Sequence, residues 1–175
     1  MATYSIDPMH SEITFKVKHL MITTVTGLFA KFSASMTSEK DDFTDASITF
    51  EADINSISTN NEQRDGHLKS DDFFNASQFP TMRFVSTGFS KKSDSEYVLT
   101  GNLTIRDKTH SVNLNTHYAG TVTDPYGQTK VGFEIDGKIN RKDFGLMWSA
   151  TTEAGGVVVS DEVRLHLNIQ MVKAA

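Results

Sequence analysis

Apolar and polar residues alternate along most of the chain with a period of two. In the segment 12–19, Ile13, Phe15 and Val17 share one face, and the other carries polar residues, Glu, Thr and two Lys. Alternation of this kind recurs in the segments 25–36, 46–55, 82–89, 97–106, 110–118, 131–139 and 162–171. It is typical of antiparallel strands with one dry and one wet face. The pattern predicts an all-β chain of about eight strands, and a phase change near Lys31 predicts a β-bulge.

One segment between the third and fourth predicted strands departs from this alternation. Thr59 and Glu62 have the spacing of a helical capping box. Helix-compatible residues follow in the range 63–70, and an aromatic stretch then runs to Phe79-Pro80. We therefore predict a short helix and an aromatic loop that together cross from strand three to strand four.

Eight strands with one dry face each must bury those faces against one another. One short helix cannot cover them, so the sheet either closes into a barrel or folds into a two-sheet sandwich. An eight-stranded barrel can be filled by side chains or can hold one small ligand. The dry faces mix large and small residues, namely Phe15, Phe50, Phe84 and Phe133 beside Ala46, Ala52, Gly101 and Gly137. These residues leave a solid core and a ligand-bearing core as open alternatives.

Length, charge and composition narrow the class of protein. The 175 residues predict one domain spanning 1–175. A net charge of −5, from 17 basic and 22 acidic residues, disfavours nucleic-acid binding. There is no cysteine, the six histidines lack metal-ligand spacing, and no apolar run is long enough to cross a membrane. No basic start followed by an apolar run is present, so we expect a cytoplasmic protein, or a periplasmic one if this is a mature form.

Several motifs then occur in a fixed order along nearly the whole chain. They are Tyr4-x-Ile6-Asp7-Pro8-x-His10-Ser11, Arg64-Asp65-x-His67-Leu68, Phe79-Pro80, Asn140-Arg141-x-Asp143-Phe144-Gly145 and Ser160-Asp161-x-Val163. In this order the chain resembles the YceI-like family of bacterial lipid-binding proteins. It departs from the family at Tyr4, where Trp is usual, and at Asp107, where Gly is common.

The resemblance implies a lipocalin-like, eight-stranded antiparallel barrel without catalysis or cofactor. It implies that the barrel binds a polyisoprenoid or a similar long-chain or fatty amphiphile, such as an isoprenoid quinone or a prenyl phosphate. On this basis we predict that the tail is lined by Phe15, Val17, Phe29, Ile48, Phe50, Phe84, Leu103, Leu114, Phe133 and Leu165. Phe73, Phe74, Phe144 and Trp148 are predicted to close or line one end.

Four polar residues have two interpretations. His19 ends a dry face, where it serves either as a head-group donor or, more commonly, as an ordinary hydrogen-bonded histidine at a barrel end. Arg64, Asp65 and His67 form either a polar rim around the ligand or an anchor that locks the helix onto the barrel. We favour the anchor, because an aromatic crossing segment needs such contacts.

Two rival functions follow from the same residues. The first rival is a filled barrel whose loops bind a protein partner, for instance in stress response. The second is a hydrolase or isomerase acting on a lipid. Asp7, His10 and Ser11 supply the residue types of a catalytic triad, but no Gly-x-Ser-x-Gly elbow accompanies them, and we predict no enzyme. A homodimer is a further open alternative for either binding protein.

Overall fold

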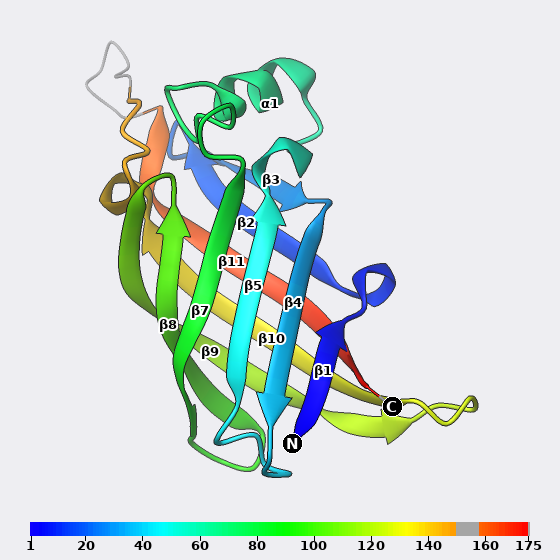
Figure 1. The fold of residues 1–175 in the computed structure, drawn as a ribbon. Coiled ribbons are helices and arrows are strands. Elements are labelled where there is room, and N and C mark those ends of the chain that lie inside the picture. Colours follow the sequence, from blue (N-terminus) through cyan, green and yellow to red (C-terminus); the bar gives the residue numbers. More distant parts are fainter. Residues whose placement is uncertain (150–157, 175) are drawn as a thin grey trace.

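The computed structural model describes residues 1–149 and 158–174, and antiparallel strands make up most of them (Figure 1). The strands are β1 (Ala2–Ile6), β2 (Glu12–His19), β3 (Thr23–Phe29), β4 (Phe32–Ser38), β5 (Ser47–Asp53), β6 (Ile57–Ser58), β7 (Thr81–Lys91), β8 (Glu96–Ile105), β9 (Lys108–Thr123), β10 (Thr129–Asn140) and β11 (Val159–Lys173). The helical elements are η1 (Pro8–His10), η2 (Ile54–Ser56), α1 (Glu62–Lys69) and η3 (Arg141–Phe144).

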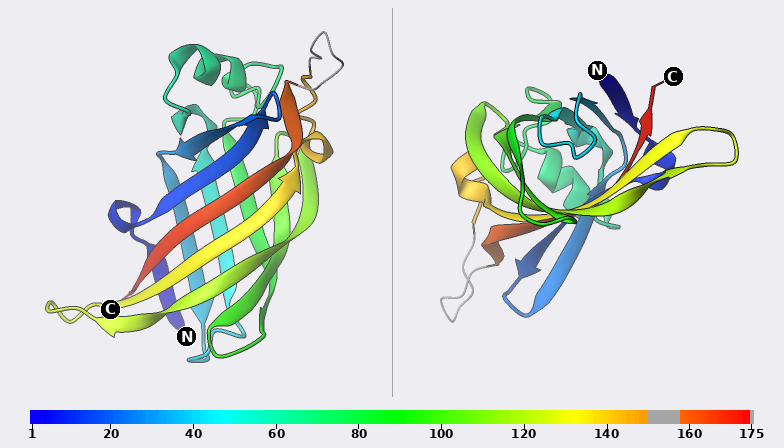
Figure 2. Two further views of the ribbon diagram at one scale, coloured as in Figure 1. Left: turned by 180° about the vertical axis from the view of Figure 1, so that it is seen from behind. Right: turned by 90° about the horizontal axis from the view of Figure 1, so that it is seen from below.

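Eight of these strands form a closed ring. Neighbours pair in the order β1-β4-β5-β7-β8-β9-β10-β11, and β11 pairs with β1 to close the ring. All of these pairings are antiparallel, so the predicted eight-stranded barrel is confirmed. The right-hand view of Figure 2 looks into this ring from below. Closure leaves the alternating dry faces nowhere to point except inward.

In chain order, each of the first three strand positions of the barrel holds two shorter strands with a break between them. β1 passes into β2 through η1, β3 into β4 at Ala30-Lys31, and β5 into β6 through η2. The sequence predicted a bulge near Lys31, and the structure instead has a complete break there. The second and third breaks are joined, since Ala30 N–H donates to the Ser56 carbonyl (3.1 Å) and Asp53 N–H to the Lys31 carbonyl (2.9 Å). β11 continues past the first break, pairing with β2 and then with β1.

The predicted helix is present as α1, which lies over one end of the barrel (Figure 1). Its N-cap is Asn61, whose side-chain oxygen accepts from Arg64 N–H at 3.0 Å. The predicted capping box on Thr59 is therefore wrong, because the Thr59 hydroxyl is already committed to the Asp65 carboxylate at 2.6 Å. None of the helices in the described residues has the length and apolar character to cross a membrane. We call this end of the barrel the helix end, and the opposite end the closed end.

Candidate functional site

The barrel encloses an apolar cavity of about 130 Å³. Residues from the barrel strands and from β2 and β3 line it, and the only polar ones are Thr14 and Thr116. Both threonine hydroxyls donate to backbone carbonyls, Thr14 to His166 (2.7 Å) and Thr116 to Leu114 (3.4 Å). A cavity of this kind offers burial to an apolar molecule and very few groups that could take part in a reaction.

Glycines explain why the barrel is not filled by its own aromatic rings. The Phe15 ring lies over Gly27, its partner on β3, and the Phe84 ring lies over Gly101 on β8. A Cβ atom at either glycine would overlap the ring. The large and small residues noted in the sequence therefore pack onto each other along the wall. This arrangement leaves space in the middle of the barrel, so the core is not solid, and whether the cavity bears a ligand stays a prediction.

Two further cavities continue the first toward the helix end. The second, of about 90 Å³, shares Phe29 and Leu165 with the first, and the third, of about 170 Å³, shares Val17 and Phe73 with the second. Phe15 lines all three. The third cavity is bordered by exposed residues of β2, so we call it the mouth. The three cavities adjoin one another between the barrel interior and the mouth, and we call this series of cavities the apolar path.

Most of the polar side chains that border this path lie at its mouth. Lys18, His19, Thr59, Arg64 and His67 border it. The Arg64 guanidinium donates to the Thr59 hydroxyl from Nε (2.8 Å) and to the Thr59 carbonyl from Nη2 (2.7 Å). The Asp65 carboxylate accepts from Thr59 N–H at 2.8 Å. Arg64 and Asp65 thus fasten α1 to the segment before it, and Arg64 also faces the mouth. Whether they act as an anchor or as a rim around a ligand stays a prediction.

Like Arg64, His67 both makes a fastening contact and borders the mouth. Its Nε2 lies 2.8 Å from Asp72 Oδ2. Its ring stands edge-on to the rings of Phe73 and Trp148, with centroids 5.0 Å apart in both pairs. The imidazole therefore ties the loop after α1 to the segment after η3, and it forms part of the mouth wall.

The predicted tail-lining residues all border the path. Nine of the ten line the first cavity, and Val17 lines the second and third. Phe73 borders the second and third cavities, Phe74 the second and Trp148 the third. Asp65 and Phe144 border none of them, because Asp65 points to Thr59 and Phe144 is buried against the His110 ring at 5.2 Å. Whether the bordering residues bind a ligand stays a prediction.

Arg141 is a cavity residue that the sequence did not single out. It is fully buried and borders the second cavity. Its guanidinium donates to the carbonyls of Ser160 (2.9 Å), Leu146 (2.5 Å) and Val159 (3.4 Å). Burial lowers the pKa of this guanidinium, and Asp161 at 3.7 Å opposes that shift. The residue holds η3 onto the start of β11. Its place in the Asn140-Arg141 motif was the feature of the sequence that could have identified it as a cavity residue.

The closed end is sealed by aromatic rings. We call the set Tyr4, Phe43, Phe89, Tyr97, Tyr118 and Phe133 the aromatic plug. Phe43 is its centre, with ring centroids 5.8 Å from each of Tyr4, Tyr118 and Phe133. The Tyr97 hydroxyl donates to the Asp42 carbonyl at 2.7 Å, and burial raises the pKa of this tyrosine. The plug closes the barrel opposite the mouth.

The candidate triad residues lie outside the path. Asp7 Oδ2 is 2.8 Å from His10 Nδ1, and this hydrogen bond is the main cause of the lowered pKa of Asp7. The Ser11 hydroxyl instead bonds the backbone of Gln170, accepting from its N–H at 3.0 Å. These contacts fix η1 against β11. In the described ranges, no group of three or more His, Asp or Glu side chains could hold a metal ion.

Comparison with known proteins gives consistent matches. A model of the YceI-like domain matches residues 4–171. A UPF0312 protein of Staphylococcus epidermidis is 34% identical over 171 residues, which is 97% of both chains. The crystal structure of a Campylobacter jejuni YceI protein superposes with a TM-score of 0.78 at 30% identity over 90% of both chains. A polyisoprenoid binding domain from Saccharophagus degradans, 16% identical, shares the fold with a TM-score of 0.68 over 96% of this chain and 97% of its own.

Proposed function

Because the chain belongs to the YceI-like domain family, we propose that it binds one polyisoprenoid or similar long-chain amphiphile inside the barrel. The protein would carry or store this lipid and leave it chemically unchanged. The observation that carries the proposal is the apolar path from the aromatic plug to the mouth. The naming of the Saccharophagus degradans neighbour as a polyisoprenoid binding domain supports it.

The path suits a long, thin, apolar tail. Burying one methylene group contributes roughly 0.8 kcal/mol, so a prenyl chain supplies ample gross affinity even after its ordering is subtracted. The aromatic plug would stop the tail, and the length of the path would therefore select among tail lengths. Phe15, which lines all three cavities, would touch the tail where it passes from the barrel interior to the mouth.

The head group would lie at the mouth, because most of the polar side chains that border the path are there. Arg141, at the second cavity, already donates to three backbone carbonyls. Lys18 and Arg64 are cations, and His19 and His67 offer ring nitrogens. A prenyl phosphate would pair with the cations, whereas the carbonyl oxygens of an isoprenoid quinone would accept hydrogen bonds. Comparing the affinity of a prenyl phosphate with that of the matching prenol at low and high salt distinguishes these two head groups.

Native mass spectrometry of gently purified protein tests the proposal. We expect a bound hydrophobic mass that lipid extraction releases. The variants Phe50→Trp and Phe133→Trp add bulk inside the first cavity, so they should lower the amount of bound lipid and weaken rebinding of an added isoprenoid.

A matched control is Ser47→Trp, which adds the same side chain at an exposed position of β5. It should retain the lipid. Wild-type protein that carries no lipid, together with Phe50→Trp and Phe133→Trp variants that bind added isoprenoid as the wild type does, would refute the proposal.

A further inference from the structure

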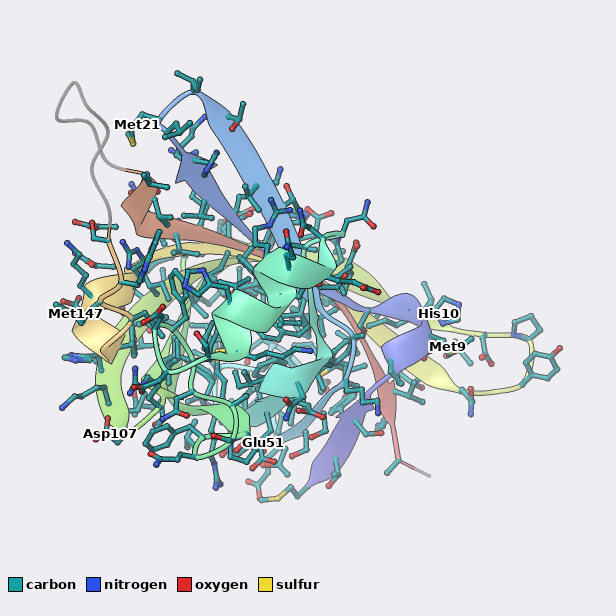
Figure 3. The ribbon with its side chains drawn as sticks, turned by 90° about the horizontal axis from the view of Figure 1, so that it is seen from above. Met9, His10, Met21, Glu51, Asp107 and Met147 are labelled. Atoms are coloured by element: carbon teal, nitrogen blue, oxygen red, sulfur yellow. The ribbon has the colours of Figure 1, made fainter. Side chains whose placement is uncertain are left out.

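The tip of the β2–β3 hairpin exposes three consecutive large apolar residues. Leu20, Met21 and Ile22 are 38%, 56% and 78% exposed. The tip stands at the helix end, beside the start of β11 (Figure 2), and Met21 projects from the molecule in the view from above (Figure 3). Such a run of exposed apolar side chains on a protruding turn is unfavourable in water and needs an explanation.

The backbone of the tip makes this composition more unusual. Ile22 N–H donates to the His19 carbonyl at 3.2 Å, which closes a β-turn around Leu20 and Met21. Both central residues have positive φ, 54° and 60°. Asn and Gly are the residues that adopt this conformation readily, and an Asn-Gly pair is the usual choice in such a hairpin. The chain instead places two large apolar residues there, at a conformational cost that folding alone does not explain.

The hairpin and its flanking residues carry positive charge, in contrast to the negative chain as a whole. The chain as a whole carries −5, yet the range 13–38 contains no Asp or Glu and does contain Lys16, Lys18 and Lys31. Lys16 also lies opposite Arg164 of β11 in the sheet register. The apolar tip is therefore followed by a basic collar, which we define as Lys16, Lys18 and Arg164. Glu162 pairs with Arg164 across 3.8 Å, and the two lysines carry the remaining positive charge. Apolar side chains ahead of basic ones are the arrangement that binds an anionic lipid surface.

The tip is also continuous with the mouth. Lys18 and His19 border the third cavity, and Leu20 N–H donates to the Val158 carbonyl at 2.8 Å beside that cavity. We propose that Leu20, Met21 and Ile22 insert into the interface of an anionic lipid bilayer while the basic collar contacts lipid phosphates. Docked in this way, the mouth would lie against the bilayer, and an apolar ligand would pass between bilayer and barrel without crossing water.

A lipid surface fits this tip better than a second copy of the chain does. A stable protein interface buries on the order of 1,000 Å² or more in total, with complementary surfaces on both sides. Three side chains on a narrow hairpin supply only part of that area, whereas insertion into a bilayer needs no complementary partner shape. The purpose of docking rests on the proposed function, but docking itself is measurable on vesicles without isoprenoid, so the two can fail separately.

Cosedimentation with vesicles tests the inference. The vesicles contain phosphatidylcholine and phosphatidylglycerol in about a 2:1 ratio, and the reference vesicles contain phosphatidylcholine alone. We expect the wild type to bind the anionic vesicles and release them at high salt. The double variant Leu20→Asn/Met21→Gly should bind at least about tenfold more weakly. Its melting temperature should be unchanged or higher, because Asn and Gly suit the turn.

Two comparisons make the test specific. Val122, near the end of β9, and Tyr126, in the β9–β10 turn at the closed end, are 64% and 90% exposed. The variant Val122→Asn/Tyr126→Ser removes a similar apolar surface there and should bind the vesicles as the wild type does. Lys16→Gln/Lys18→Gln should weaken binding to anionic vesicles and flatten its salt dependence. If the Asn-Gly variant does not fold, Met21→Gln replaces it.

Three results would overturn the inference. The first is wild-type protein that stays in the supernatant with anionic vesicles. The second is equal binding by wild type and the folded tip variant. The third is a wild-type dimer, seen by light scattering, that the tip variant converts to a monomer while neither protein binds vesicles. This last result would assign the tip to contact between two copies of the chain.

Discussion

The two ends of the barrel are closed in different ways. At the closed end, aromatic rings contact one another directly, and Phe43 is buried among three of them. At the helix end, α1 has no fully buried residue, and two cavities border its side chains. A closure made of packed rings opens only when core packing is lost, whereas a closure made of a loosely packed helix opens locally. Under the proposed function, ligand exchange would therefore occur at the helix end, and the closed end would limit the tail length.

Polar contacts reinforce the contrast between the ends. In the loop before β5, the Asp45 carboxylate accepts from the Ser38 hydroxyl (2.7 Å) and from the N–H groups of Glu39 (2.7 Å) and Lys40 (3.2 Å). At the helix end, the buried Thr59 hydroxyl accepts from Arg64 and donates to Asp65. The first set fixes the loop that carries Phe43, and the second holds α1 in place over the mouth.

The largest expected effect comes from removing the centre of the plug. Phe43→Ala should lower the free energy of unfolding by about 3–5 kcal/mol, because the site loses three ring contacts and leaves a cavity. Phe73→Ala at the helix end should lower it by about 2 kcal/mol, because Phe73 already borders cavities on one side. Equilibrium denaturation in urea measures both. Equal losses for the two variants would contradict the distinction between the ends.

A smaller and local effect is expected at Thr59. Thr59→Val keeps the shape of the side chain but leaves Arg64 Nε and Asp65 Oδ1 each without one partner. We expect α1 to open more easily by about 2 kcal/mol, since these hydrogen bonds involve charged groups. Hydrogen exchange of the α1 amides should become faster while the amides of β8 and β9 keep their protection.

The control for this variant is Thr104→Val. The Thr104 hydroxyl bonds the Thr109 hydroxyl at 2.7 Å on the exposed side of the β8–β9 hairpin. Its loss should change stability by less than about 0.5 kcal/mol. Unchanged exchange of α1 in Thr59→Val would show that Arg64 and Asp65 do not hold the helix in place.

The smallest effect is a pH dependence at the closed end. Hydrogen bonds from Ser38 and Glu39 lower the pKa of Asp45 from 3.8 to about 2. A carboxylate with a lowered folded-state pKa stabilises the fold above its unfolded pKa, and this contribution is lost as pH falls through the folded value. Melting curves should therefore show a loss of stability between about pH 4 and pH 2 that is smaller in Asp45→Asn, because other carboxylates with a lowered pKa, such as Asp7, still contribute. Asp41→Asn, in the same loop, should follow the wild type.

The sequence predicted most of the barrel because each strand carries its own evidence of burial. Alternation located the strands from β2 onward, apart from the two-residue β6, and placed Phe15, Phe50 and Phe133 on inward faces. It did not locate β1, whose five residues are too few to show a pattern. At Lys31 the alternation showed only a phase change and not the break. The break depends on which strands pair on either side of it, and that pairing is set by the closed ring.

The candidate site was predictable where it follows the alternation and unpredictable where it depends on tertiary contacts. A threonine hydroxyl caps a helix or bonds a side chain equally well, so the choice of Asn61 over Thr59 as N-cap could not be inferred locally. The burial of Arg141 depends on three carbonyls from two segments that meet only in the fold. Phe144 was placed at an end by its motif, yet it packs against His110 rather than lining a cavity.

The three interrupted strand positions have a consequence for kinetics. β2, β3 and β6 pair with one another and with β11, while the eight-membered ring closes without them. The part of the wall next to the mouth can therefore separate while the hydrogen bonds of the ring remain intact. The residence time of a bound molecule would then be set by this local opening rather than by the rate of global unfolding. Thermal stability and ligand off-rate would accordingly vary independently of each other.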